Sequence, residues 1–285
     1  MKTSALRVAL SATLAAVLIG LLSLPGCGAG EPSAAAEMPS LDSRADSMAM
    51  QLYRAHGGPE VWTNVPALAY TFAVGKAVKD GDTTRQRVAR HWWRRSDGQY
   101  RVRWSEGPDS TYTAVFNTNE FSREPPTGRA ALNGTRLDSA AEQRALRQAH
   151  VRYANDSYWL LAPLKLFNDG VNRSLAADPV RADSLPRALH LNFDQVGLTP
   201  KDRYWLTPDS TTGRLARWTF ALQGMGPEQP PGVFRWTGYE SFSTPAGPLT
   251  LSTRKENVGG PRVVYTDQIR TPATLPDSLF SIGRQ

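Results

Sequence analysis

A period-two alternation of apolar and polar residues runs through most of the chain and limits what it can fold into. In ALAYTFAVGKAV (67–78), large side chains occupy one side and small side chains the other. The alternation returns in TTRQRVARHWWRR, QYRVRWSE and TYTAVFN, and again in several segments between residues 188 and 271. Turn signals such as Ser96-Asp97-Gly98 separate these segments. The pattern predicts a mainly β (α+β) fold with an antiparallel sheet, arranged as a sandwich or a barrel.

The alternation also predicts the interior face of each strand, because residues i and i+2 lie on one side of a sheet. The predicted interior residues are Leu68, Tyr70, Phe72, Val74 and Val78, then Tyr100, Val102 and Trp104, and later Trp218, Phe220 and Leu222. The adjacent residues Trp92 and Trp93 must point to opposite faces. The pattern does not decide which of the two is outside.

An N-terminal helix is predicted ahead of the first strand. Residues 40–58 place apolar side chains at intervals of three and four, with Ser40 as a candidate cap. Gly57 and Gly58 should end this helix. Trp62 follows in a turn or in a second short helix.

A central helix is predicted between the two groups of strands. Ser139 and Glu142 have the spacing of a capping box, in which each side chain satisfies a free N–H at the start of a helix. The helix should run to about Tyr153 and end at Asn155.

The most apolar segment, NDSYWLLAPLKLFNDG (155–170), comes next. We expect a short helix that stops at Pro163 and then an extended LKLF, because proline disfavours helical geometry in the residue before it. Its large side chains include Tyr158, Trp159 and Leu160. Each is worth roughly 1.5–3 kcal/mol when buried, so the segment needs either a core or a bound apolar ligand.

The N-terminus has the three parts of an export signal: the basic residues Lys2 and Arg7, an apolar run over 8–24, and LPGC at 24–27. Cys27 is the single cysteine of the chain. LPGC resembles the lipobox of bacterial lipoproteins, which implies cleavage before Cys27 and a lipid anchor on its thiol. An ordinary cleaved signal and an uncleaved membrane helix are the alternatives.

Three parts of the chain follow from this N-terminus. Residues 1–26 are predicted as a signal peptide, 27–40 as a lipidated start with a flexible tether, and 41–285 as one domain. The residue after Cys27 is Gly28, whereas proteobacterial lipoproteins that are retained in the inner membrane have an aspartate at this position. The lipoprotein resemblance therefore implies the cell envelope, at the outer membrane.

Signatures of catalysis, metal binding and cofactor binding are missing from the sequence. It contains no G-x-S-x-G, H-E-x-x-H, G-x-x-x-x-G-K-[ST] or G-x-G-x-x-G pattern, so we predict neither an enzyme nor a cofactor. The four histidines lack metal-ligand spacing. We expect His56 to bond a helix end or loop, His91 and His190 to be exposed or satisfied on strands, and His150 to lie on the outer face of the central helix.

The Arg- and Trp-rich stretch HWWRRSDGQYRVRW has the composition of a single-stranded nucleic-acid platform. The alternative is a sheet with arginine outside and aromatic residues inside. An envelope location favours the sheet, so we predict no nucleic-acid partner.

The order of these features resembles the LolA/LolB-like lipoprotein-carrier fold, and more closely a family of uncharacterised envelope lipoproteins with that fold. The residues that carry the resemblance are His56-Gly57-Gly58, Trp62, Tyr158 to Pro163, Asp169-Gly170-Val171 and VGLTPKDRYW (196–205). The resemblance implies a strongly curved antiparallel sheet that forms an unclosed barrel. It also implies an N-terminal helix, a central helical plug on the concave face, and an apolar cavity between sheet and helices.

Two functions remain open. The first is a membrane-anchored lipoprotein, monomeric, that binds a lipid, an acylated protein or another apolar ligand, in lipoprotein or lipid trafficking. Its candidate cavity residues are Tyr70, Phe72, Val74, Tyr100, Val102, Trp104, Tyr158, Trp159, Leu160, Trp218 and Phe220. The second is a non-enzymatic structural or interaction lipoprotein with a filled core. An apolar cavity of about 300–1,000 Å³ would favour the first.

Overall fold

The fold is seen in a computed structural model that describes residues 40–78, 83–120, 126–180, 188–194, 196–226 and 228–283. The predicted signal peptide, most of the tether and Cys27 lie outside the described residues. In the described part of the chain, no helix is both long enough and apolar enough to cross a membrane.

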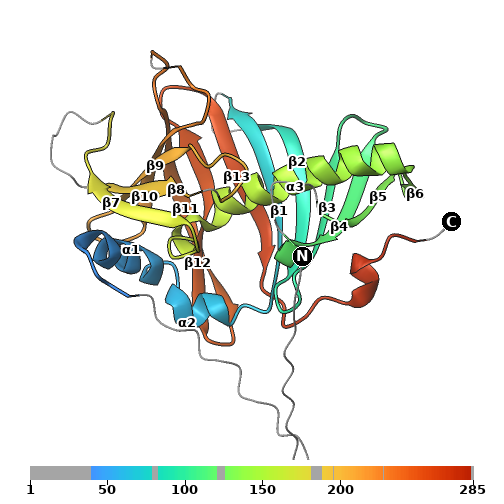
Figure 1. Cartoon of the computed structure of the whole chain (residues 1–285), viewed down its shortest axis with the longest axis horizontal. Coiled ribbons are helices and arrows are strands. Elements are labelled where there is room, and N and C mark those ends of the chain that lie inside the picture. Colours follow the sequence, from blue (N-terminus) through green and yellow to red (C-terminus); the bar gives the residue numbers. More distant parts are fainter. Residues whose placement is uncertain are drawn as a thin grey trace, which may run out of the picture. The chain divides into compact units, whose positions relative to one another are not determined.

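The described residues form thirteen strands and three α-helices (Figure 1). The strands are β1 (Ala67–Ala77), β2 (Thr83–Arg94), β3 (Gln99–Ser105), β4 (Thr111–Asn117), β5 (Gly128–Leu132), β6 (Thr135–Arg136), β7 (Val171–Ala176), β8 (Ala188–Phe193), β9 (Arg203–Pro208), β10 (Leu215–Ala221), β11 (Gly232–Thr244), β12 (Gly247–Asn257) and β13 (Arg262–Arg270). The helices are α1 (Arg44–Arg54), α2 (Gly58–Thr63) and α3 (Ser139–Leu161), with 3₁₀ turns η2 (Thr118–Glu120), η3 (Ala162–Leu164) and η4 (Asp277–Phe280).

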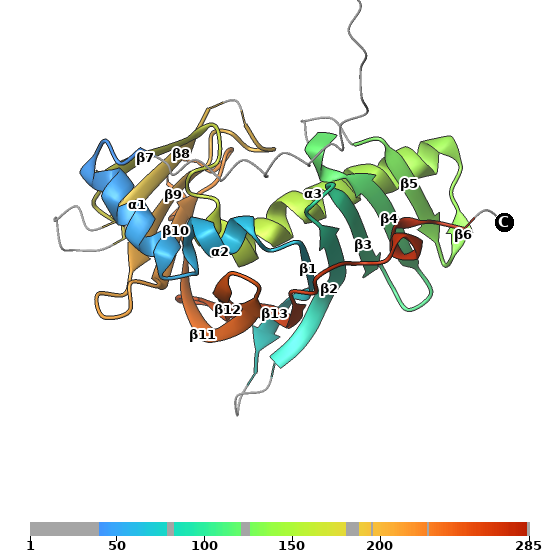
Figure 2. The same cartoon turned by 90° about the horizontal axis from the view of Figure 1, so that it is seen from below.

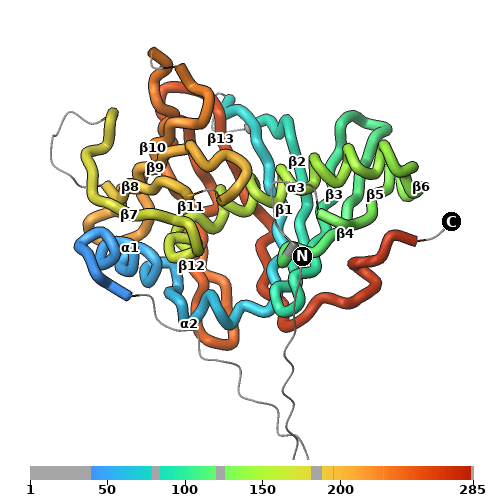
Figure 3. The backbone as a smooth tube through the Cα atoms, in the orientation of Figure 1, coloured from blue at the N-terminus to red at the C-terminus, as the bar shows by residue number. Residues whose placement is uncertain are grey.

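All thirteen strands belong to one antiparallel sheet in the order β6-β5-β4-β3-β2-β1-β13-β12-β11-β10-β9-β8-β7. The chain therefore builds β1 to β6 outward from the centre, and later fills the other side from β7 back to β13 (Figure 3). β13 pairs extensively with β1, so it belongs with the β1–β6 side, and this side joins β7–β12 through β12 and β13, which pair over only three residue pairs, from Arg254 with Tyr265 to Glu256 with Val263. This short ladder is the narrowest junction between the two sides.

The expected strong curvature is wrong. The sheet is open, as predicted, with β6 and β7 as its two edges, but it is not strongly curled and therefore does not form a barrel. The mainly β class, the antiparallel pairing, the short N-terminal helix and the long central helix are confirmed.

The helices cover one face of the sheet (Figures 1 and 2). The first part of α3 packs against β3, β4 and β5, while α1 contacts β7 and β8, and α2 contacts β12. The buried residues Leu160 and Leu161 at the end of α3 reach the core beneath α2. A single long helix thus spans both sides of the narrow junction.

Both predicted helix starts are shifted by a few residues. Ser43, not Ser40, caps α1 by accepting from the N–H of Asp46. Asp138, not Ser139, caps α3, and its side chain accepts from the N–H of Ala141. Glu142 does not complete a capping box: its Oε1 accepts from the N–H of Ala130 on β5.

The predicted break at Asn155 is also wrong, because α3 continues without interruption to Leu161. Packing of the buried Asp156, Ser157 and Leu160 against the sheet outweighs the local preference of Asn155 for a helix end. The α-helix does stop near Pro163, at Leu161, but Pro163 itself lies in η3, and the residues after η3 form turns rather than an extended strand.

Burial of the strand faces follows the predicted alternation except at strand ends. Leu68, Tyr70, Phe72, Tyr100, Val102, Trp104 and Trp218 are buried, and Val74 and Phe220 are half-buried. Val78 and Leu222 are 46% and 45% exposed, against the prediction. Each lies one residue beyond the end of its strand, β1 or β10, where the pleat no longer directs the side chain.

The structure resolves the question of the two tryptophans. Trp93 points to the helix-covered face, where its Nε1 donates to Thr118 Oγ1 at 3.2 Å. Trp92 lies on the other face, within cation–π distance of Arg90 and Arg101. Register explains the assignment, because Trp93 is opposite the buried Tyr100 and Trp92 is opposite Arg101.

Candidate functional site

The predicted cavity residues do not line one cavity but pack into three apolar clusters. Tyr70, Phe72, Val74 and Leu160 belong to a cluster beneath α2; Tyr158, Trp218 and Phe220 to one beside α1; and Tyr100, Val102 and Trp104 to one beneath the first part of α3. Trp159 joins the first two clusters. A cleft of about 450 Å³ opens elsewhere, beside the free part of β13, and none of the predicted residues lines it.

Trp159 is the centre of an aromatic layer between α3 and the sheet. Its ring centroid lies 4.5 Å from that of Trp218, 4.8 Å from that of Phe234 and 6.1 Å from that of Phe220. Trp159 is half-buried, whereas the next residue, Leu160, is fully buried. The layer is therefore accessible at the end of α3.

Three buried polar atoms in or beside this layer form no hydrogen bond: Tyr158 Oη, Trp218 Nε1 and Trp236 Nε1. A buried donor without an acceptor costs roughly 1–3 kcal/mol. Unmet donors in an otherwise apolar layer are the groups that a ligand or an ordered water would satisfy.

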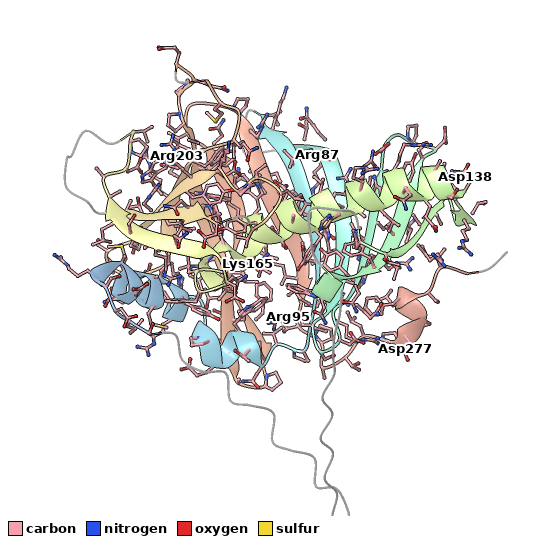
Figure 4. The ribbon with its side chains drawn as sticks, viewed as in Figure 1. Arg87, Arg95, Asp138, Lys165, Arg203 and Asp277 are labelled. Carbon is pink, nitrogen blue, oxygen red and sulfur yellow. The ribbon has the colours of Figure 1, made fainter. Side chains whose placement is uncertain are left out.

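Two cations lie where α1, α2, α3 and the end of β2 meet, at Arg95 and Lys165 (Figure 4). Arg95 Nη1 donates to the carbonyl oxygens of Trp62 and Val65, each at 2.6 Å, and its guanidinium lies 3.8 Å from the centroid of the Trp62 ring. Lys165 Nζ donates to Ser157 Oγ at 2.8 Å. Among the described residues, no carboxylate lies within 4.0 Å of either cation.

Removal from water lowers the pKa values of both cations. Burial lowers the pKa of Lys165 to about 8, with a further lowering from the charge of Arg95. Burial also lowers the pKa of Arg95 to about 10. Both side chains are half-buried, so water screens part of the repulsion between these like charges, and an anion that accepts from both would remove the rest.

Aromatic side chains enclose the cation pair. Lys165 Nζ lies 5.8 Å from the ring centroid of Tyr153 and 5.7 Å from that of Tyr158. Burial raises the pKa of Tyr53 and of Tyr153 to about 12, so both remain neutral hydroxyls that can donate. Since Tyr158 also belongs to the aromatic layer around Trp159, the cation pair and the apolar layer are continuous.

A separate buried polar network lies nearby. Tyr70 Oη is 3.1 Å from Tyr100 Oη, which is 2.8 Å from His91 Nδ1. His91 Nε2 lies 3.3 Å from Asp156 Oδ2, and Asn155 donates to the other oxygen of Asp156 at 2.8 Å. Tyr70, His91, Tyr100 and Asp156 are at most 3% exposed, so this network joins α3 to the sheet without access for a substrate.

The other histidines are structural as well. His56 accepts from the N–H of Leu215 and bonds the carbonyl of Thr250, so it connects β10 with β12 rather than bonding a helix end or loop as predicted. His150 is 2% exposed, against its predicted place on the outer face of the helix. The described residues contain no group of His, Cys, Asp and Glu that could hold a metal ion.

Sequence reasoning missed Arg95, Lys165, His91 and Asp156 as members of sites. Lys165 did carry a signal, because it is the single charge between Tyr158 and Phe167. Arg95 carried none, since it is one of several arginines in its strand region. Only the tertiary fold brings the two together.

The comparisons with known proteins leave the function open. No family profile and no curated protein matches this chain. Among solved structures, the chain is similar to a DUF1329 family protein from Desulfovibrio piger, with 10% sequence identity and a TM-score of 0.44 over 83% of this chain and 97% of that chain. The function of this chain therefore has to be inferred from its own residues.

Proposed function

We propose that this protein is a membrane-anchored envelope lipoprotein that binds an anionic amphiphile, such as a lipid or an acylated protein. The anionic group would lie between Arg95 and Lys165. The acyl part would follow the aromatic layer around Trp159. The chain would act as a carrier or receptor and not as an enzyme.

The observation that carries the proposal is the carboxylate-free cation pair. Buried Lys and Arg are normally paired, because an unpaired buried charge is costly. Here Arg95 meets two carbonyl oxygens and Lys165 meets one hydroxyl. A phosphate or carboxylate would accept from both cations in charge-assisted hydrogen bonds.

The surroundings favour an amphiphile over a small polar anion. The walls of the site are aromatic, and they continue into the layer with unmet donors at Tyr158 and Trp218. Binding sites for small ligands are mostly apolar with a few placed polar groups, which is the composition found here. The resemblance to the LolA/LolB-like carriers supports the same class of ligand.

Native mass spectrometry of the full chain, extracted from its own membranes, tests the proposal. We expect a non-covalent anionic lipid adduct on the protein that carries no substitution. The double variant Arg95→Met/Lys165→Met should lose it, because charge-assisted hydrogen bonds contribute about 1.5–3 kcal/mol each. A protein without adduct, or an adduct that survives in the double variant, would refute the proposal.

A matched control uses cations outside the site. Arg44 and Lys76 are exposed and have no described side-chain partner. Arg44→Met/Lys76→Met removes the same charges, so it should keep the adduct. Equal loss in both double variants would point to net charge rather than to a site.

The alternative is a structural or interaction lipoprotein with a filled core. Its specific support is the close packing of the three clusters, with Leu160, Leu161, Leu166 and Leu206 all 0% exposed. It predicts no lipid adduct and co-purification with a protein partner instead.

The membrane anchor is tested separately. Cys27→Ser should move the protein from the membrane to the soluble fraction or leave an uncleaved precursor. Sucrose-gradient fractionation distinguishes the proposed outer membrane from the inner one. Normal cleavage with unchanged membrane retention would exclude the anchor.

A further inference from the structure

The charged side chains that β2 to β5 direct away from the helices are all basic, and the C-terminal turn η4 covers part of this face at Arg94 and Arg101. Tyr100, Val102 and Trp104 pack beneath α3, so their neighbours along β3 lie on the opposite face. Following the register across the four strands, every charged side chain on that face is an arginine: Arg85, Arg90, Arg94, Arg101, Arg103 and Arg129, of which Arg129 reaches back to Glu142 on α3. We call this the arginine face.

Three members of the arginine face have no carboxylate partner among the described residues. Arg85 pairs with Asp267, Arg94 with Asp97 and Asp277, and Arg129 approaches Glu142 at 3.8 Å. Arg90 and Arg103 form no ion pair, and Arg101 donates only to the carbonyl oxygens of Leu279 and Ser281.

The positions of the unpaired arginines destabilise the sheet. Arg90 and Arg103 are directly opposite each other in the β2–β3 ladder. Like charges in such a cross-strand pair repel and weaken a sheet. The charge of Arg103 also lowers the pKa of Arg101, in addition to the larger lowering from burial. An external anionic surface would remove this repulsion.

Trp92 lies among these arginines and is half-exposed. Its ring is 5.0 Å from the guanidinium carbon of Arg90 and 5.8 Å from that of Arg101. An amphipathic indole ring surrounded by cations is typical of residues at the headgroup level of a membrane. Val88, 41% exposed, is further along the same strand on the same face.

We infer that the arginine face docks on the anionic headgroups of a lipid bilayer. The guanidinium fork matches phosphate oxygens, and each cation near an anionic leaflet adds to binding. A single-stranded nucleic acid fits less well, because successive bases need several exposed aromatic rings. Trp93, Tyr100 and Trp104 all point to the opposite face, which leaves Trp92 as the one aromatic ring that the described residues of β2 to β5 place on the arginine face, with Phe280 of η4 over Arg94 beside it. The inference does not depend on a ligand at Arg95 and Lys165.

Quenching of tryptophan fluorescence by brominated lipid can test this. The eight tryptophans lie between residues 62 and 236, so the N-terminal segment contributes no signal of its own. The full chain is reconstituted in brominated phosphatidylcholine vesicles with or without brominated phosphatidylglycerol. We expect stronger quenching with phosphatidylglycerol, and we expect high salt to remove the increment.

The variants assign the signal to the arginine face. Trp92→Phe should lose the increment, while Trp205→Phe, on β9, should keep it. Arg90→Gln/Arg103→Gln should weaken docking by about 25-fold, as each arginine near an anionic surface contributes about fivefold. Arg90→Lys/Arg103→Lys keeps the charge and should retain docking, as should Arg44→Gln on α1.

Several outcomes would overturn the inference. Equal quenching with and without phosphatidylglycerol is one. Retention of the increment in Trp92→Phe or in Arg90→Gln/Arg103→Gln, with unchanged melting temperature, is another. A fluorescence change on adding oligodeoxythymidine, without any response to phosphatidylglycerol, would assign the face to nucleic acid instead.

Discussion

Two adjacent residues of α3, Asp156 and Ser157, belong to buried polar clusters that are organised in opposite ways. In the His91 network, one carboxylate, one imidazole and two phenols meet each other in sequence. At the other cluster, Lys165 and Arg95 share a site without any described carboxylate. The comparison teaches that a buried polar group stabilises the fold when its partners are inside the chain, and indicates a ligand when they are not.

Removing a member of the closed network should have the largest effect. Asp156→Ala leaves His91 and Asn155 without their partner, and we expect a loss of about 3–5 kcal/mol in the free energy of unfolding. Urea denaturation measures it. Asp156→Asn retains an acceptor toward His91 and should lose less. A loss below about 1 kcal/mol for Asp156→Ala would show that the network does not hold α3 to the sheet.

Truncation in the aromatic layer should come next. Trp159→Ala removes contacts with Trp218 and Phe234, and a core truncation of this kind costs about 3 kcal/mol or more. A sharp fall in melting temperature would support a static core. A small fall together with loss of bound lipid would support a gate at the end of α3.

Hydrogen exchange across residues 156–170 separates these two outcomes further. Protection equal to that of the central sheet, and unchanged by added lipid, would identify a static element. Exchange that slows when lipid is added would support a gate.

Lys255 is a buried cation without access to a ligand. It therefore serves as a reference for the cost of a buried charge that neither a carboxylate nor a ligand compensates. It is 0% exposed, donates to the Ser252 carbonyl at 2.6 Å and lies 4.8 Å from the Trp236 ring. Burial lowers its pKa from 10.5 to about 7, which corresponds to about 5 kcal/mol of destabilisation at low pH. Loss of its hydrogen bond and ring contact offsets part of this.

Lys255→Met should therefore stabilise the protein by about 3 kcal/mol near neutral pH. The folded pKa lies below the unfolded one, so the destabilisation is absent above pH 10.5, grows as the pH falls, and is complete below about pH 7. The advantage of Lys255→Met in urea denaturation should shrink correspondingly as the pH is raised. An advantage that does not change between pH 7 and pH 10 would contradict the assigned cause.

Lys165→Met should have the smallest effect on stability. Lys165 is partly exposed, so water reduces the cost of its charge, and we expect a change within about 1 kcal/mol. The same variant should lose most of the lipid adduct. A large change in stability with an unchanged adduct would place Lys165 with the structural groups and not with the site.

Local pattern was sufficient for the strands and for the burial of Tyr70, Tyr100 and Trp104, because period-two alternation is a property of neighbours along one strand. It failed at Val78 and Leu222, where the strand ends and the alternation continues. It also failed at Asn155, since the length of α3 depends on what the helix packs against. The curvature of the sheet could not be predicted from local pattern, because it depends on how all thirteen strands of the described residues twist and pack against the helices.

The sequence by itself determined the class of fold and the apolar character of the segment around Trp159, and it predicts the N-terminal anchor. Only the tertiary structure decided which polar residues act together. His91 and Asp156 are 65 residues apart in the chain, and Arg95 and Lys165 are 70 residues apart. The sequence of a charged residue is the same whether its side chain is solvated, paired or buried alone. The electrostatic energy of its charge depends on the local dielectric and on the partners that the fold brings close to it. Neither can be read from the residues next to it in the sequence.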